Sequence, residues 1–207
     1  RVRDADALAR ACDLGVAMQL TNIARDVGED ARAGRIYLPL DWIHAEGLDP
    51  QSVLSATQAS PELRRMVKKL LSEAHALYAR SEVGVAAFPL NARTGIYAAR
   101  YIYAAIGQAV TRNHYDSITH RGRTNRVQKM VLLAKSSLRT TASLVMPRSP
   151  VLYARPLPEV QFLVDAVAVN QRHAMSWGQG HTGAFMTAMA ELKQKERAET
   201  SGVMLAK

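Results

Sequence analysis

Cysteine is almost absent from this sequence, since Cys12 is the single one among 207 residues. A disulfide framework is therefore excluded, and one thiol inside a helical pattern fits a small buried hydrophobe in a reducing, cytoplasmic setting. Long hydrophobic runs are missing too, because none approaches the roughly 20 apolar residues that cross a bilayer. No stretch alternates apolar and polar residues as a strand does, and aromatic residues make up only 6% of the chain. These gaps leave a helical globular fold as the expectation.

Positive charge is what the chain has in excess. Its 27 Lys and Arg outnumber 18 Asp and Glu, which gives a formal net charge of +9. Such a charge suits an anionic partner, namely a nucleic acid, an anionic membrane surface or a phosphorylated substrate. The sequence has no recognised nucleic-acid-binding motif, so no nucleic-acid partner is expected. The basic run over 112–139 is either a solvated face or a contact for diphosphate or lipid headgroups.

Helical periodicity and helix-end signals divide the chain into several helices. Ser60 before Pro61 predicts a helix start, because Ser caps a helix and Pro fits its first position. Polar residues 113–125 and Pro-rich residues 146–158 are expected to be non-helical connections, and a short helix is expected within "LDPQSVLSAT". The predicted fold class is all-α, with the main helices over 4–30, 39–46, 60–82, 91–112, 126–145, 158–176 and 184–198. In the first helix the apolar residues at helical spacing are Leu8, Cys12, Val16, Leu20, Ile23 and Val27.

The most informative stretch is "QLTNIARDVGEDARAGRIYLP", residues 19–39. A solvated helix face would favour Lys, Glu and Gln, whereas Asn and Asp inside a helix each cost roughly a few tenths of a kcal/mol against Ala. Asp26 and Asp30, one turn apart, also repel each other. A function for these side chains is therefore the better hypothesis. On a helical projection at about 100° per residue, one arc of about 100° holds Gln19, Asn22, Asp26, Glu29 and Asp30.

Two carboxylates one turn apart, with amides on the same face, are typical of a site for a hard divalent cation. Mg²⁺ usually takes one or two carboxylates and completes its shell with water and phosphate oxygens. Arg25 and Arg35 would add charge-assisted hydrogen bonds to the same phosphates. The stretch therefore predicts magnesium-dependent binding of a diphosphate.

The same residues carry a family resemblance. Gln19-Leu-Thr-Asn22-Ile-Ala-Arg25-Asp26-Val-Gly-Glu29-Asp30, followed by Gly34-Arg35-Ile-Tyr37-Leu38-Pro39, resembles the second aspartate-rich signature of the squalene/phytoene synthase family. The match fixes many residue types, so it is far more specific than a bare DxxxD. It is most similar to the bacterial phytoene synthases of carotenoid biosynthesis and extends over roughly residues 4–145.

The resemblance implies the all-α isoprenoid synthase fold, here in part, which is a helical bundle around a central cavity. It also implies a transferase that joins two geranylgeranyl diphosphates head to head, through a cyclopropyl diphosphate, to phytoene, with Mg²⁺ or Mn²⁺. Two alternatives stay open. One is a squalene- or dehydrosqualene-type synthase that uses farnesyl diphosphate, and the other is a non-catalytic scaffold subunit of the same fold.

By the same resemblance, Asp26 and Asp30 match the metal-binding aspartates, with Asn22 as a further metal ligand. Gln19, Asn22 and Arg25 match residues that orient the metal and the diphosphate. Arg35 and Tyr37 belong to the "GRxYLP" part at the diphosphate end. Catalytic roles are thus expected for Arg25, Asp26, Asp30 and Tyr103, and substrate-binding roles for Gln19, Asn22, Arg35, Tyr37 and Arg121.

Tyr103 and Arg121 lie in "ARYIYAAIGQAVTRNHYDSITHRGR", which resembles a later helix of the family and the loop after it. Tyr103 fits the family's Y-x-x-I pattern. Where the family has an arginine pair this chain has His120 and Arg121, so only Arg121 is carried over.

The family's first aspartate-rich motif, which precedes the second, is not in this sequence. We therefore expect 1–207 to be the C-terminal part of a single isoprenoid synthase domain, inactive on its own. Residues 146–207 would form a Pro-containing connection and C-terminal helices. The expected partners are prenyl diphosphates, and contacts with the inner membrane face and with downstream carotenoid enzymes are left open.

Overall fold

The computed structural model describes residues 4–145 and 149–174. No strand occurs in these two ranges, so the predicted all-α class is confirmed. The α-helices are α1 (Ala5–Arg32), α2 (Leu40–Ala45), α3 (Pro50–Leu54), α4 (Pro61–Glu82), α5 (Leu90–Arg112), α6 (Arg126–Ala142) and α7 (Gln161–Ala174). Three short 3₁₀ helices accompany them, namely η1 (Val85–Ala87), η2 (Pro150–Tyr153) and η3 (Pro158–Val160).

The predicted helices agree with these bounds to within a few residues. Ser60 caps α4 as expected, because its hydroxyl accepts the backbone N–H of Leu63 at 3.3 Å. The helix predicted over 184–198 lies outside the described residues. The Pro-rich connection is not wholly non-helical, since η2 lies within it. Buried Arg10 holds this turn by donating hydrogen bonds to the carbonyls of Val151 at 2.9 Å and Ala154 at 3.0 Å. The local sequence does not predict these contacts.

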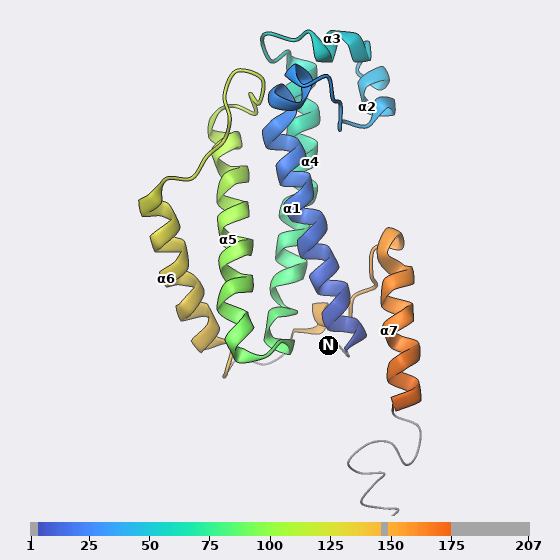
Figure 1. Cartoon of the computed structure of the whole chain (residues 1–207), viewed down its shortest axis with the longest axis vertical. Helices are drawn as coiled ribbons and strands as arrows, with labels where there is room; N and C mark the ends of the chain where they lie inside the picture. The colour runs from blue at the N-terminus through green and yellow to red at the C-terminus, as the bar shows by residue number, and fades with distance from the viewer. Residues whose placement is uncertain (1–3, 146–148, 175–207) are drawn as a thin grey trace, which may run out of the picture. The chain divides into compact units, whose positions relative to one another are not determined.

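Two compact units make up the chain, one of residues 6–161 and one of residues 1–5 with 162–207. The first unit holds every predicted site residue. In it the long helices α1, α4 and α5 run alongside one another, and α6 packs on α5 (Figure 1). The short helices α2 and α3 lie beyond the C-terminal end of α1 (Figure 1). In the second unit the described structure consists almost wholly of α7.

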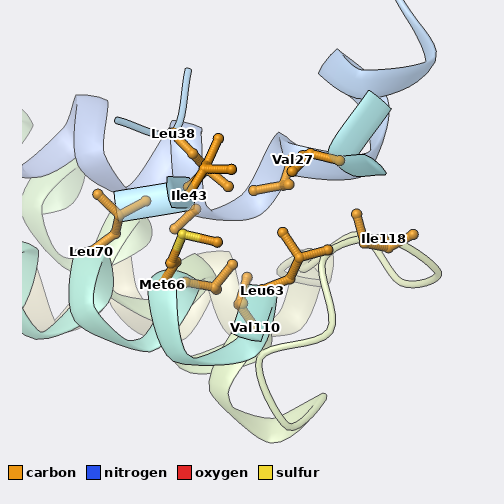
Figure 2. Close-up of a cluster of buried hydrophobic side chains, with 11 residues drawn as sticks. Val27, Leu38, Ile43, Leu63, Met66, Leu70, Val110 and Ile118 are labelled. Carbon is orange, nitrogen blue, oxygen red and sulfur yellow. The ribbon is translucent and has the colours of Figure 1, made fainter. Parts of the chain in front are cut away.

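A core of apolar side chains ties these elements together around the C-terminal half of α1. It combines residues of α1, α2, α4 and α5 with the connection after α5 (Figure 2). Ile43 and Val110 are fully buried in it, and Ile118 brings the connection into the same cluster. The labelled members are Val27, Leu38, Ile43, Leu63, Met66, Leu70, Val110 and Ile118.

Between residues 17 and 24, small residues form the fully buried side of α1. Ala17, Thr21 and Ala24 are inaccessible to solvent, whereas Leu20 and Ile23, which belong to the apolar row read from the sequence, are only half-buried. Small side chains let neighbouring backbones approach closely. Thr21 lies beside the phenol of Tyr78 on α4, with 2.8 Å between the two hydroxyl oxygens, and burial raises the pKa of Tyr78 to about 12. Cys12, which was expected to be a small buried hydrophobe, is only half-buried.

Candidate functional site

Asp26 is the centre of an ion-paired cluster on the C-terminal half of α1. Its side chain is 16% exposed. Arg25 donates two hydrogen bonds to this carboxylate, one of them from Nε to Asp26 Oδ1 at 2.8 Å. Arg121, from the connection after α5, donates from Nε to the same Oδ1 at 2.9 Å. A terminal nitrogen of Arg121 also lies 2.8 Å from Glu29 Oε2. The fold therefore brings two arginines and two carboxylates together.

The charge of Asp26 follows from this setting. Burial alone would raise the pKa of the Asp26 carboxyl, because it disfavours the charged form. Hydrogen bonds and positive charge from Arg25, and then from Arg121, outweigh burial and hold the pKa of Asp26 below its ordinary value. Asp26 is thus an anion at neutral pH, which a metal ligand of this type requires.

A second pair forms where α1 ends. Gly34 has a φ of 71°, a left-handed conformation that glycine adopts readily. Its N–H donates to the carbonyl of Ala31 at 3.0 Å, and the N–H of Arg35 donates to that of Asp30 at 2.8 Å. This paired closure, a Schellman motif, turns the chain back over the last turn of the helix. Arg35 consequently reaches the Asp30 carboxylate, at 3.2 Å.

Tyr103 lies on α5 near the first cluster. It is half-buried and packs with the apolar side chains of Ala17, Ala74 and Tyr78. Its charge, when ionised, contributes to the raised pKa values of Arg25 and Tyr78, so Tyr103 is close to both.

The other predicted side chains lie outside the ion pairs. Gln19 is exposed and Asn22 half-buried on the same arc of α1 as Asp26. Tyr37 is exposed and borders a small hollow together with Asp30 and Arg35. His120, which replaces the first arginine of the family's pair, is exposed.

Three residues of this site were given no role from the sequence. Glu29 was counted on the polar arc, and that placement was the available signal for its pairing with Arg121. Gly28 and Asp116 shape the approach of the connection to α1. Their roles depend on contacts between distant segments, which no local pattern reveals.

The donor set fits a metal that is shared with a phosphorylated ligand. Within residues 4–145 and 149–174, no group of three or more His, Cys, Asp or Glu side chains forms a metal site. Asp26 and Asp30 offer carboxylates one helical turn apart, and Asn22 offers an amide oxygen on the same arc. Mg²⁺ commonly binds through one or two carboxylates plus phosphate oxygens, so these residues fit it.

Comparison with known proteins identifies the family. A family model for squalene/phytoene synthase matches residues 1–130, which include every predicted site residue. The chain belongs to the squalene/phytoene synthase family. The phytoene synthase of Rhodobacter capsulatus is 48% identical over 197 residues, covering 95% of this chain and 57% of that protein. The phytoene synthase of Cereibacter sphaeroides is 50% identical over 197 residues, covering 95% and 54%.

Solved structures agree with this family. A crystal structure of a dehydrosqualene synthase in complex with ligand matches with a TM-score of 0.59 and 31% identity, over 67% of this chain and 48% of that one. The predicted isoprenoid synthase fold is therefore confirmed. This member of the squalene/phytoene synthase family spans only a little over half the length of the two phytoene synthases described above.

Proposed function

We propose that the protein containing this chain is a phytoene synthase, which condenses two geranylgeranyl diphosphates head to head to phytoene in carotenoid biosynthesis. The observation that supports a diphosphate-binding enzyme is the cluster of Asp26 with Arg25 and Arg121, which lies within the residues that match the family model. Identities of 48% and 50% to two phytoene synthases, each over 95% of the chain, favour this activity over others of the family.

Each side chain of the site has a proposed task. Asp26, Asp30 and Asn22 would hold Mg²⁺ or Mn²⁺, as enzymes of this family use a divalent metal with prenyl diphosphates. When bound, the metal neutralises charge that develops on the departing diphosphate. Arg25 and Arg121 keep Asp26 ionised, and these two arginines together with Arg35 would donate hydrogen bonds to diphosphate oxygens. Gln19 and Tyr37 would orient the same group, and Tyr103 would line the reacting end.

A farnesyl-using dehydrosqualene-type synthase is the second candidate. The structural match to a dehydrosqualene synthase favours it specifically. The diphosphate-binding residues serve both activities equally, so they do not separate C20 from C15 substrates. A scaffold subunit of the same fold is the third alternative, and the ionised Asp26 with its two arginines argues against it, because a scaffold has no need of a charged cluster at partial burial.

Product analysis tests the proposal. The native polypeptide that contains residues 1–207 is incubated with geranylgeranyl or farnesyl diphosphate and Mg²⁺, with and without NADPH, and the extracted hydrocarbon is identified. A C40 product formed without NADPH is the expected result. A C30 product would move the substrate to farnesyl diphosphate. No product from either substrate, together with no binding of Mg²⁺ and pyrophosphate, would overturn the enzyme proposal.

We also propose that α6 contacts an anionic membrane surface. None of the helices among the described residues is long and apolar enough to span a bilayer. However, α6 turns hydroxyls of Ser136 and Thr140 inward and exposes an apolar row. Exposed Arg126 and Lys129 lie at the start of the same helix, which suits anionic headgroups, whereas the Lys135 ammonium lies over the Tyr101 ring, 4.5 Å from its centroid. The exposed row consists of Val127, Met130, Val131 and Leu138.

Vesicle flotation tests this contact. Leu138→Glu should reduce binding to vesicles that contain phosphatidylglycerol, whereas Leu90→Glu, at an exposed leucine of α5, should not. Equal binding by both variants would refute a role for α6. We likewise propose that the protein contacts downstream carotenoid enzymes and that residues 1–207 are the C-terminal part of a single isoprenoid synthase domain.

A further inference from the structure

Arg121 belongs to a connection, residues 113–125, whose path is fixed by unusual backbone contacts. α5 ends in a Schellman closure in which His114 takes the left-handed position that glycine normally occupies, with a φ of 54°. Tyr115 follows with a φ of 60°, so two consecutive non-glycine residues are left-handed. Such backbone carries a cost and persists only where other contacts impose it.

Asp116 supplies those contacts. Its carboxylate is buried, and Oδ1 accepts the backbone N–H groups of Ile118 at 3.1 Å and Thr119 at 2.9 Å. Its Oδ2 accepts the Thr119 hydroxyl at 2.7 Å and Arg64 of α4 at 3.1 Å. Arg64 also donates to the carbonyl of His114 at 2.8 Å. The Asp116 carboxylate therefore stabilises a tight turn and, through Arg64, links this turn to α4.

This turn is pressed directly onto α1 at Gly28. The N–H of Gly28 donates to the carbonyl of Ser117 at 2.9 Å. A Cβ atom on Gly28 would lie 2.6 Å from the carbonyl oxygen of Ile118, so the backbone of the connection would have to shift to admit it. Three residues after Ile118, Arg121 reaches Asp26 and Glu29, which flank Gly28 on the helix.

The connection is held again just after Arg121. A Cβ atom on Gly122 would lie 2.6 Å from the Val110 side chain and 3.2 Å from the Ile106 carbonyl oxygen of α5. Arg121 is thus bracketed by one close contact with α1 and one with α5, while its own side chain is 39% exposed. The backbone on either side of Arg121 therefore determines the direction in which its side chain points.

We infer that Asp116 is a positioning residue that, through the turn pressed onto Gly28, fixes the guanidinium of Arg121 beside Asp26 for binding of a metal-bound diphosphate. The inference rests on the proposed function, since it assigns Arg121 to the diphosphate. Asp116 itself is not proposed to bind the substrate. It acts by preorganising Arg121, so its effect on ligand binding passes through that one side chain.

The test is a double-mutant cycle with inorganic pyrophosphate and Mg²⁺ as the probe, measured by calorimetry on the native polypeptide that contains this chain. Asp116→Ala should weaken pyrophosphate binding by about 10- to 100-fold, the usual scale for losing a residue that orients a ligand-binding group. In an Arg121→Gln background the same change should have almost no further effect. Asp116→Asn, which keeps one acceptor oxygen for the turn, should recover part of the affinity.

A control and a ligand-free readout separate positioning from general damage. Asp49 likewise caps a turn, accepting the N–H of Gln51 at 3.0 Å, so Asp49→Ala should bind pyrophosphate like the wild type. Amide hydrogen exchange at Ile118 and Thr119 should rise in Asp116→Ala without ligand. Additive losses in the double variant, or unchanged affinity in Asp116→Ala, would overturn the inference and leave the proposed function standing. Wild-type protein that binds no pyrophosphate with Mg²⁺ would overturn both.

Discussion

Arg121 donates from Nε to Asp26 Oδ1 at 2.9 Å although 95 residues separate the two along the chain. One residue belongs to the helix that carries the aspartates and the other to an irregular connection. This contact helps to keep the Asp26 carboxylate ionised and holds the guanidinium of Arg121 beside the helix that carries both aspartates.

Replacing Asp26 by Asn should abolish most activity and leave the fold intact. The amide is isosteric but carries no charge, so it binds Mg²⁺ poorly and no longer pairs with Arg25 and Arg121. We expect kcat to fall by at least about a hundredfold, the scale seen when a group that stabilises developing charge is removed. The measurement is steady-state hydrocarbon formation.

Asp41→Asn is the control, because Asp41 is an exposed acid on α2. It should change kcat little. If Asp26→Asn kept full activity, Asp26 would not be a metal ligand.

The pKa of Asp26 should rise in Arg121→Gln. Burial raises this pKa and the two arginines lower it, so removing one arginine shifts the balance towards burial. Carboxyl-carbon NMR during an acid titration of metal-free protein measures the change. Arg123→Gln, two residues further along, should leave the titration of Asp26 as in the wild type, and equal shifts in the two variants would point to overall charge instead of the contact.

The same balance sets a pH window for stability. The folded pKa of Asp26 lies below its ordinary value of 3.8, which stands for the unfolded chain. Its ion pairs therefore stabilise the fold at pH values above 3.8, and this contribution disappears as pH falls through the lower, folded pKa. Arg121→Gln should consequently lose more stability near neutral pH than in strong acid, as urea unfolding at several pH values would show.

The aspartate-rich half of the site could be predicted from the sequence because it is local. Helical spacing alone places Asp26 and Asp30 on one arc. Gly34 indicates a turn at the end of the helix, and this turn brings Arg35 back to Asp30. The pairing of Arg121 with Asp26 could not be predicted in this way. It depends on how α5, α4 and α1 pack, on left-handed backbone at His114 and Tyr115, and on the close approach at Gly28, none of which has a local periodic signal. The buried face of α1 shows the same limit, because the small residues Ala17, Thr21 and Ala24 are fully buried there, whereas the larger apolar Leu20 and Ile23 are only half-buried.

Glu82 should prove important for the attachment of α6. At the end of α4 it accepts Arg139 of α6 at 3.0 Å and the Tyr101 hydroxyl at 3.2 Å, and Arg100 Nε lies 3.1 Å from its other oxygen. Glu82→Gln removes the charge that these donors share, so we expect a loss of about 1 kcal/mol in the free energy of unfolding. Faster amide exchange in α6 should accompany it. Glu73→Gln, on the exposed side of α4, serves as the control and should change neither quantity.

Two glycines of α1 offer a matched test of how the site is assembled. Gly15 and Gly28 both lie inside the helix, where Ala is intrinsically better than Gly by roughly 0.5–1 kcal/mol. Nothing lies within 4 Å of a Cβ atom added at Gly15, so Gly15→Ala should stabilise the protein by about that amount. At Gly28 the added methyl would meet the backbone of Ser117 and Ile118 at 2.6–2.7 Å.

Gly28→Ala should therefore destabilise the protein by about 1–3 kcal/mol, the usual range for overpacking. Because the connection must move away from α1, pyrophosphate binding should weaken as well, whereas Gly15→Ala should bind as the wild type does. Thermal unfolding and calorimetry on both variants measure the two effects. If Gly28→Ala were as stable as Gly15→Ala and bound pyrophosphate equally well, the close approach at Gly28 would not be what directs Arg121 to Asp26.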